Sequence, residues 1–121
     1  MITVYHYEGC STCKKARKWL DAHDIEVKLV PIVEKPPSKK VLVDVLKATG
    51  LPVRKLFNTS GQLYREGGYK DRLESMTDKE ALDELAAHGK LIKRPLVVGD
   101  GVHLVGFKEA DYEAALSAPS R

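Results

Sequence analysis

The chain has 121 residues, of which 43% are hydrophobic and 31% are charged, and its net charge is +3 at pH 7. A chain of this length suits one domain and can bury a core without structural disulfides or metal ions. Basic and acidic residues are interleaved, so we do not expect the protein to bind nucleic acid directly. No apolar run approaches the roughly 20 residues of a membrane span, and no signal-peptide pattern opens the chain, so we expect a cytoplasmic protein.

The first third of the chain predicts a strand, a helix and a second strand. The segment "ITVYHY" (2–7) places alternate residues on two faces, which indicates a strand. After the turn "EGCSTC", either Ser11 or Thr12 is expected to cap a helix. The β-branched segment "IEVKLVPIV" (25–33) predicts a second strand that ends near Pro31. The buried face of the helix is expected to comprise Cys13, Ala16, Trp19 and Leu20.

The middle of the chain predicts helices and turns. Ser38 is expected to cap an amphipathic helix that Gly50 ends. Residues 51–76 mix short apolar pairs with glycine and polar breaks, which indicates short helices and turns. The segment "TDKE" (77–80) has the pattern of a capping box and predicts the start of another helix.

The last third of the chain predicts a hairpin and a final helix. In "RPLVVGDGVHLVGF" (94–107), two apolar segments flank "GDG", whose glycines can adopt positive φ. A helix is expected over 108–116, followed by a frayed tail over 117–121. Because a β-α-β unit has parallel strands and a hairpin has antiparallel ones, we predict a small mixed sheet in an α/β fold.

The two cysteines of the chain form one C-x-x-C motif, Cys10 and Cys13, at the predicted start of the first helix. Helix N-termini and nearby cations lower the pKa of a thiol and favour its nucleophilic thiolate. We therefore expect Cys10 to be the exposed, activated sulfur and Cys13 to be the resolving one, while the helix N–H groups could hold an oxyanion. Two alternatives are half of a zinc site, for which no paired histidines are present, and two inert buried thiols.

Four further residues are candidates for a supporting role. His6 is either a packed strand residue or a group that tunes the Cys10 thiolate. Arg94 is either a solvated surface charge or a residue whose guanidinium binds an oxyanion or a thiolate near Cys10. Pro95 opens a strand, and the Arg94–Pro95 bond can be cis, which the sequence does not decide. Asn58 lies in "FNTSG", which is either a turn or a polar replacement for an oxyanion-binding arginine.

The motifs together resemble the arsenate reductase/Spx family. The resemblance extends from "TVYHYEGCSTCKKARKWL" through "PPS" and "LIKRPLVVGDG" to "VGFKEADYE", nearly the whole chain. It implies a single domain over 1–121 with a thioredoxin-like fold: a mixed four-stranded sheet in a core of about 1–35 and 90–118, interrupted by a helical insertion of about 36–89.

The family contains enzymes and regulators, so the resemblance implies two functions. In the glutaredoxin-linked arsenate reductases, a cysteine at the position of Cys10 attacks arsenate, a glutathione mixed disulfide forms, and glutaredoxin reduces it. Positions matching His6 and Arg94 tune the cysteine and hold the oxyanion. This sequence departs from those enzymes at Cys13, where they usually lack cysteine, and at Asn58 and Gly106, where they carry arginines. The loss of two arginines argues against arsenate reduction.

The C-x-x-C and the "VGF" ending look more like the Spx side of the family. The middle segment "LFNTSGQLYREGGYKDRL" does not resemble Spx itself, and is most similar to a third, poorly characterised group of arsenate-reductase-like proteins with a C-x-x-C. Spx proteins bind the C-terminal domain of the RNA polymerase α subunit and use the cysteine pair as a thiol/disulfide switch. Our first hypothesis is a thiol–disulfide oxidoreductase whose catalytic residues are Cys10, Cys13 and Arg94, supported by His6, Ser11, Thr12, Pro95 and Asn58. Glutaredoxin or thioredoxin would be the electron donor and glutathione a candidate co-substrate, with no metal. The second hypothesis is an Spx-like regulator.

Overall fold

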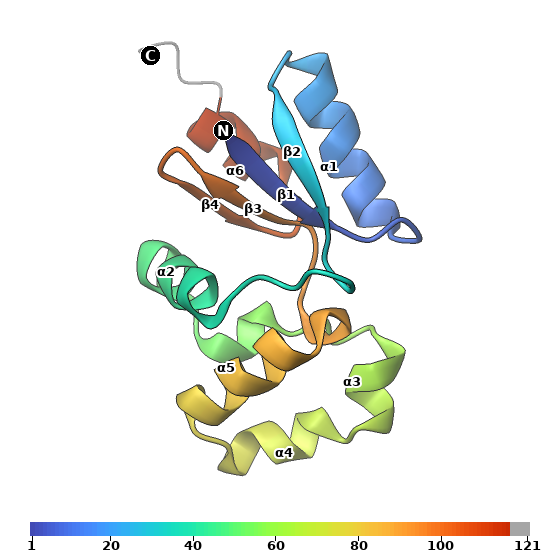
Figure 1. The fold of residues 1–121 in the computed structure, drawn as a ribbon, viewed down its shortest axis with the longest axis vertical. Coiled ribbons are helices and arrows are strands. Elements are labelled where there is room, and N and C mark those ends of the chain that lie inside the picture. Colours follow the sequence, from blue (N-terminus) through green and yellow to red (C-terminus); the bar gives the residue numbers. More distant parts are fainter. Residues whose placement is uncertain (117–121) are drawn as a thin grey trace. The chain divides into compact units, whose positions relative to one another are not determined.

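The computed structural model describes residues 1–116 and divides the chain into two compact units (Figure 1). Of the described residues, the first unit comprises Met1–Pro31 and 94–116, and the second comprises Ile32–Lys93. The predicted insertion, 36–89, falls within the second unit. The expected tail over 117–121 lies outside the described residues, and the single-domain organisation stays a prediction.

The first unit contains a four-stranded mixed sheet, as the sequence predicted. Its strands are β1 (Ile2–His6), β2 (Val27–Pro31), β3 (Leu96–Gly99) and β4 (Val102–Val105), and its helices are α1 (Ser11–Ala22) and α6 (Glu109–Leu116). The strand order is β2-β1-β3-β4. β1 pairs with β2 in parallel, while β1–β3 and β3–β4 are antiparallel. A β-α-β unit and a hairpin therefore share one sheet.

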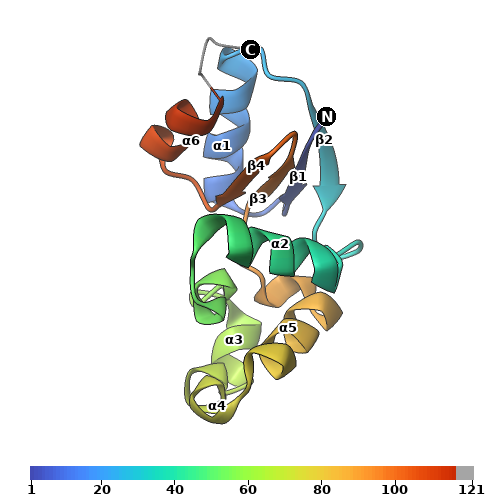
Figure 2. The same ribbon diagram turned by 90° about the vertical axis from the view of Figure 1, so that its left-hand side faces the viewer.

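The core of the first unit lies between one face of the sheet and helices α1 and α6, which Figure 2 shows on the same side. Tyr112 of α6 is 1% exposed, and its hydroxyl donates a hydrogen bond of 2.7 Å to the carbonyl oxygen of Gly106. Its ring makes edge contacts with Trp19 and Phe107. The buried residues of this core are Ile2, Val4, Ala16, Trp19, Leu20, Val97, Leu104 and Tyr112.

The predicted hairpin is present, and its turn uses positive φ at three consecutive residues. These are Gly99 (φ 132), Asp100 (φ 52) and Gly101 (φ 81). A Cβ on Gly99 would lie 2.5 Å from the carbonyl oxygen of Met1, so both the backbone conformation and the space require glycine.

The second unit is helical. It contains α2 (Lys39–Thr49), the 3₁₀ helix η1 (Val53–Leu56), α3 (Gln62–Glu66), α4 (Tyr69–Ser75), α5 (Asp78–Ala87) and the 3₁₀ helix η2 (Gly89–Leu91). Three predictions are confirmed: Ser38 caps α2, Gly50 ends it with φ 73, and Thr77 and Glu80 form a capping box on α5. Among the residues that the structure describes, no helix is both long and apolar enough to cross a membrane.

Candidate functional site

Cys10 itself caps helix α1. Its backbone is extended (φ −95, ψ 115), and its sulfur accepts a hydrogen bond of 3.3 Å from the N–H of Cys13. The prediction that Ser11 or Thr12 is the cap is therefore wrong. The N–H of Cys10 donates to the carbonyl oxygen of Tyr7 at 3.1 Å, and this turn lets the helix begin directly at Ser11. A sulfur thus occupies the position where the free N–H groups of the helix converge.

This position makes Cys10 the more acidic of the two thiols. Burial raises the pKa of Cys10, but four contributions together outweigh it and bring the pKa below its ordinary value. They are hydrogen bonds from the thiol and from the N–H of Cys13, the positive charge of Arg94, and the N–H of Thr12. Cys10 is also partly exposed, so the thiolate it forms is accessible.

Cys13 behaves in the opposite way. It is 1% exposed, and its pKa is raised to about 12, mainly by burial. The hydrogen bond to Cys10 and the nearness of the Cys10 thiolate contribute to this increase, while a backbone hydrogen bond from Tyr7 and the charge of Arg94 oppose it. Two neighbouring sulfurs therefore have well-separated proton affinities, with one partly exposed anion and one buried thiol.

We predict that only one thiolate forms between about pH 5 and pH 10. The pKa of Cys10 lies below its ordinary value, whereas Cys13 keeps its proton until about pH 12. Ultraviolet absorbance of the thiolate, followed over this range, measures the number of ionising groups. Cys10→Ser should abolish the transition. Cys13→Ala should keep it but move it upward, because the hydrogen bond from the Cys13 thiol is lost; two transitions in the wild type would contradict the assignment.

Arg94 reaches the cysteine loop together with a residue that the sequence analysis missed, Tyr7. The antiparallel register of β1 and β3 pairs Tyr5 with Leu96, and two residues further along it places Tyr7 opposite Arg94. The guanidinium carbon of Arg94 lies 4.5 Å from the centroid of the Tyr7 ring. The same ring lies close to Gly9, where an added Cβ would be 3.3 Å from Tyr7 Cε2. The ring of Tyr7 thus connects the arginine with the loop.

A cation over an aromatic face is held by the ring quadrupole, at about 0.5–1 kcal/mol for exposed sites. Because Arg94 lowers the pKa of Cys10, we predict that Tyr7→Leu raises the Cys10 pKa and slows alkylation of the thiolate at neutral pH by roughly two- to fivefold. Tyr7→Phe keeps the ring face and should leave both quantities unchanged. Equal effects of the two variants would show that the hydroxyl, and not the ring, is what matters.

Pro95 and Gly106 complete the backbone around Arg94. The Arg94–Pro95 peptide bond is cis, which the sequence left open. Strand β3 begins at Leu96, so Pro95 precedes the strand instead of opening it. The carbonyl oxygen of Pro95 accepts a hydrogen bond of 2.9 Å from Gly106, whose φ is 73. A φ of 73 is the left-handed conformation that favours glycine over residues with a side chain.

His6 lies on the same face of β1 as the buried residues Ile2 and Val4. Its Nδ1 is buried and has no hydrogen-bond partner within residues 1–116. Burial lowers the pKa of His6, and the charge of Arg17 lowers it further, against an opposing effect of Glu8. His6 is not among the groups that shift the Cys10 pKa, so its supporting role stays a prediction.

The structure also places the other residues that were predicted to support the site. Ser11 is exposed in the first turn of α1, and Thr12 is partly buried there with its N–H toward the Cys10 sulfur. Asn58 belongs to the second unit, where its N–H donates to the carbonyl oxygen of Leu91 at 2.7 Å. Its own carbonyl oxygen accepts from Gly61 at 3.0 Å, so "FNTSG" forms a turn. In the described part of the chain, no group of three or more histidine, cysteine or acidic residues could hold a metal ion.

Comparisons with known proteins match nearly the whole chain. A model of the ArsC family matches residues 5–115. The protein YusI of Bacillus subtilis is 46% identical over 112 residues, which are 93% of this chain and 95% of that protein. A solved structure described as a possible arsenate reductase from Streptococcus mutans UA159 is 40% identical, with a TM-score of 0.82, over 89% of this chain and 92% of that one. The global transcriptional regulator Spx of Streptococcus pyogenes is 25% identical over 121 residues, 100% of this chain and 89% of the regulator.

Proposed function

This chain belongs to the ArsC family, and from that premise we propose that it is a thiol–disulfide oxidoreductase whose redox pair is Cys10 and Cys13. The observation that carries the proposal is the opposite shift of the two pKa values within one turn of helix α1. A thiolate is the attacking species in disulfide exchange, and a neighbouring protected thiol can resolve the product. The cytoplasm, where thiols are kept reduced, is the location that suits such a pair.

The reaction with a disulfide substrate takes two steps. The Cys10 thiolate attacks one substrate sulfur, a bond forms between the two sulfurs, and the other substrate sulfur leaves as a thiolate. Cys13 then loses its proton to water and attacks the Cys10 sulfur, which releases the second substrate thiolate and forms the Cys10–Cys13 disulfide. Two electrons have passed from the protein to the substrate. A dithiol donor of the glutaredoxin or thioredoxin class returns them by the reverse exchange, with glutathione as a candidate co-substrate.

Arg94 and the first turn of α1 have the role of stabilising negative charge at the Cys10 sulfur. The guanidinium and the N–H groups of Thr12 and Cys13 all lower the pKa of this thiol. The same groups could hold an oxyanion such as arsenate beside the sulfur. Because Asn58 and Gly106 replace two arginines, a disulfide is the preferred substrate class of the proposal, and arsenate or a related oxyanion is the next candidate.

A second function has a specific observation in its favour. The chain is similar to Spx over its whole length and carries a C-x-x-C motif. In this alternative the Cys10–Cys13 disulfide is a switch, and the partner is the C-terminal domain of the RNA polymerase α subunit. The enzyme is the stronger proposal because an accessible low-pKa thiolate serves turnover directly.

The test is a coupled assay of NADPH oxidation. Arsenate and a small disulfide are each offered with glutaredoxin and glutathione, and separately with thioredoxin. Each pair is run with the wild type and with Cys10→Ser, because the donors reduce small disulfides by themselves. Turnover that is present in the wild type and lost in Cys10→Ser, with any of these pairs, supports the oxidoreductase and identifies its donor. Absence of such Cys10-dependent turnover with all four pairs, while oxidation still forms the Cys10–Cys13 disulfide, would overturn it. In that case, binding of the α C-terminal domain to the reduced and oxidised protein would test the alternative.

A further inference from the structure

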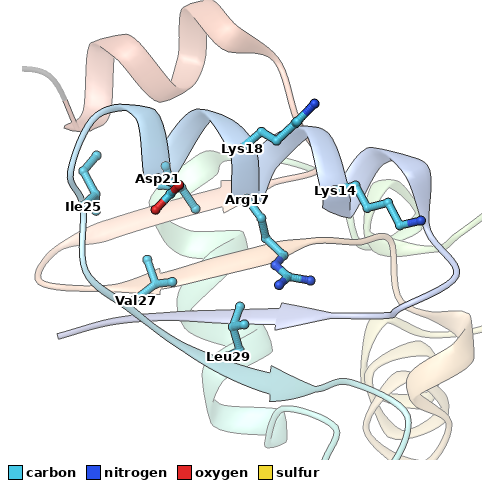
Figure 3. Close-up of a pocket in the computed structure, with 8 residues that line it drawn as sticks. Lys14, Arg17, Lys18, Asp21, Ile25, Val27 and Leu29 are labelled. Carbon is cyan, nitrogen blue, oxygen red and sulfur yellow. The ribbon is translucent and has the colours of Figure 1, made fainter.

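An open apolar surface lies beside helix α1, on the side of strand β2. It forms a pocket of about 550 Å³ within the first unit. Figure 3 shows α1 on one side of it and β2 on the other. We refer to it as the β2 shelf, and its lining residues are Lys14, Arg17, Lys18, Leu20, Asp21, Ile25, Val27 and Leu29.

The shelf is apolar because α1 covers β1 but leaves β2 open. Val27 is paired with Ile2 and Leu29 with Val4, so these residues of β2 lie on the face of the sheet that α1 packs against. Val4 is fully buried, whereas Leu29 is 40% exposed. An exposed leucine beside a covered strand shows that the apolar face of the sheet extends beyond the helix.

Strand β2 is also the edge of the sheet. The order β2-β1-β3-β4 leaves its outer side without a paired strand among the residues described. The N–H and C=O groups of an open edge are a template for an added extended segment. The edge that a partner strand could pair with is the five residues of β2, Val27–Pro31. It ends at Pro31, which has no N–H to donate.

The helix above the shelf contributes three basic residues and one acidic residue to its lining, Lys14, Arg17, Lys18 and Asp21. Figure 3 shows Arg17 directed from α1 toward Leu29, while Lys18 is directed away from the strand. The charge of Arg17 lowers the pKa of His6, which agrees with a guanidinium held over the end of β1. None of the three cations forms a salt bridge with a carboxylate in residues 1–116.

We propose that the β2 shelf binds an extended segment of a partner protein, which adds to the outer side of β2 and presents an apolar side chain flanked by acidic ones. The apolar side chain packs on Val27 and Leu29, and the acidic ones face Arg17 and Lys14. An open strand edge is recognised by main-chain groups, which favours a polypeptide over a lipid or a small anion. The binding needs no thiol chemistry, so it is independent of the reaction proposed above.

The probe is the acetylated and amidated peptide Glu-Thr-Val-Thr-Glu, titrated into the ¹⁵N-labelled full chain carrying Cys10→Ser. Alternate side chains of a strand share a face, so the two glutamates and the valine can face the shelf together. We expect saturable amide shift changes centred on 27–31 and on the first half of α1. A peptide with lysines in place of the glutamates should bind at least about fivefold more weakly. Successive N–H groups point to opposite edges of a strand, so one peptide is N-methylated at the valine and another at the second threonine, and binding of at least one of them should be weakened by loss of a main-chain donor.

A matched pair of variants tests the role of the shelf itself. Arg17→Glu should weaken binding of the peptide at least about fivefold, whereas Lys15→Glu, which makes the same charge change on α1 outside the lining, should change it less than about twofold. Absence of shifts on β2 at millimolar peptide would overturn the proposal. So would equal effects of the two variants or insensitivity to both N-methylations, since either would mean general charge attraction. Binding of decanoate in place of the peptide would instead assign the shelf to an anionic amphiphile and also overturn it.

Discussion

Replacing Cys10 with serine is expected to lower the rate of thiol-dependent turnover by at least about a thousandfold. The serine hydroxyl stays protonated where the Cys10 thiol ionises, and it cannot form a disulfide with the substrate. The first turn of α1 keeps an acceptor, since a serine oxygen can take the N–H of Cys13, so the helix should begin unchanged. The measurement is NADPH oxidation with the donor and substrate pair on which the wild type is active.

The matched variant is Cys13→Ser, which removes the resolving thiol and leaves the attacking one. It should complete the first exchange and then accumulate one mixed disulfide per chain on Cys10. With a symmetric substrate disulfide, this is detectable as a mass increase of half of the substrate's mass less one hydrogen. Catalysis that continues at the wild-type rate in Cys10→Ser would place the chemistry elsewhere. A mixed disulfide on Cys13 in the wild type would reverse the two roles.

Replacing Tyr112 with alanine is expected to lower the free energy of unfolding of the first unit by about 3–5 kcal/mol. The side chain is 1% exposed, and its ring centroid lies 5.6 Å from that of Trp19 and 4.8 Å from that of Phe107. Truncation therefore leaves a cavity between α6 and α1 and removes two edge-to-face contacts. Urea unfolding followed by Trp19 fluorescence is the measurement, because Trp19 is the only tryptophan in the chain and lies in this core.

Tyr112→Phe separates packing from the hydrogen bond. It keeps the ring but leaves the buried carbonyl oxygen of Gly106 without the hydroxyl donor, which costs about 1–3 kcal/mol. The alanine variant should therefore unfold at a lower urea concentration than the phenylalanine variant, with a similar slope. Equal midpoints for the two variants would mean that the ring contributes little, in disagreement with its burial.

The secondary structure follows from local patterns, and this explains why most of it could be predicted. Alternation of residues between two faces predicted β1, the capping box at 77–80 predicted the start of α5, and the "GDG" turn predicted the hairpin. Each of these signals lies within a few neighbouring residues. The resemblance to the arsenate reductase/Spx family, and with it the thioredoxin-like fold, is confirmed by the ArsC match and by the similar solved structures.

The candidate site was predicted only in part, because its contacts depend on geometry that a sequence does not state. Serine and threonine are better caps than cysteine on average, so propensity pointed to Ser11 or Thr12 and missed the sulfur of Cys10. The contact of Tyr7 with Arg94 depends on the register of β1 against β3, which joins distant parts of the chain. Burial, which raises the pKa of Cys13, likewise depends on the assembled core.

The sulfur that caps helix α1 also bears on the reduction potential of the proposed Cys10–Cys13 couple. Hydrogen bonds and the charge of Arg94 stabilise the Cys10 thiolate, and this stabilisation exists only while the pair is reduced. A couple whose reduced form is stabilised in this way is a stronger oxidant than a pair of ordinary cysteines. Compared with ordinary cysteines, such a couple is more easily reduced and less easily oxidised. A substrate must therefore be correspondingly more oxidising to draw electrons from this couple, and a switch built on it would form its disulfide under more oxidising conditions than a pair of ordinary cysteines would.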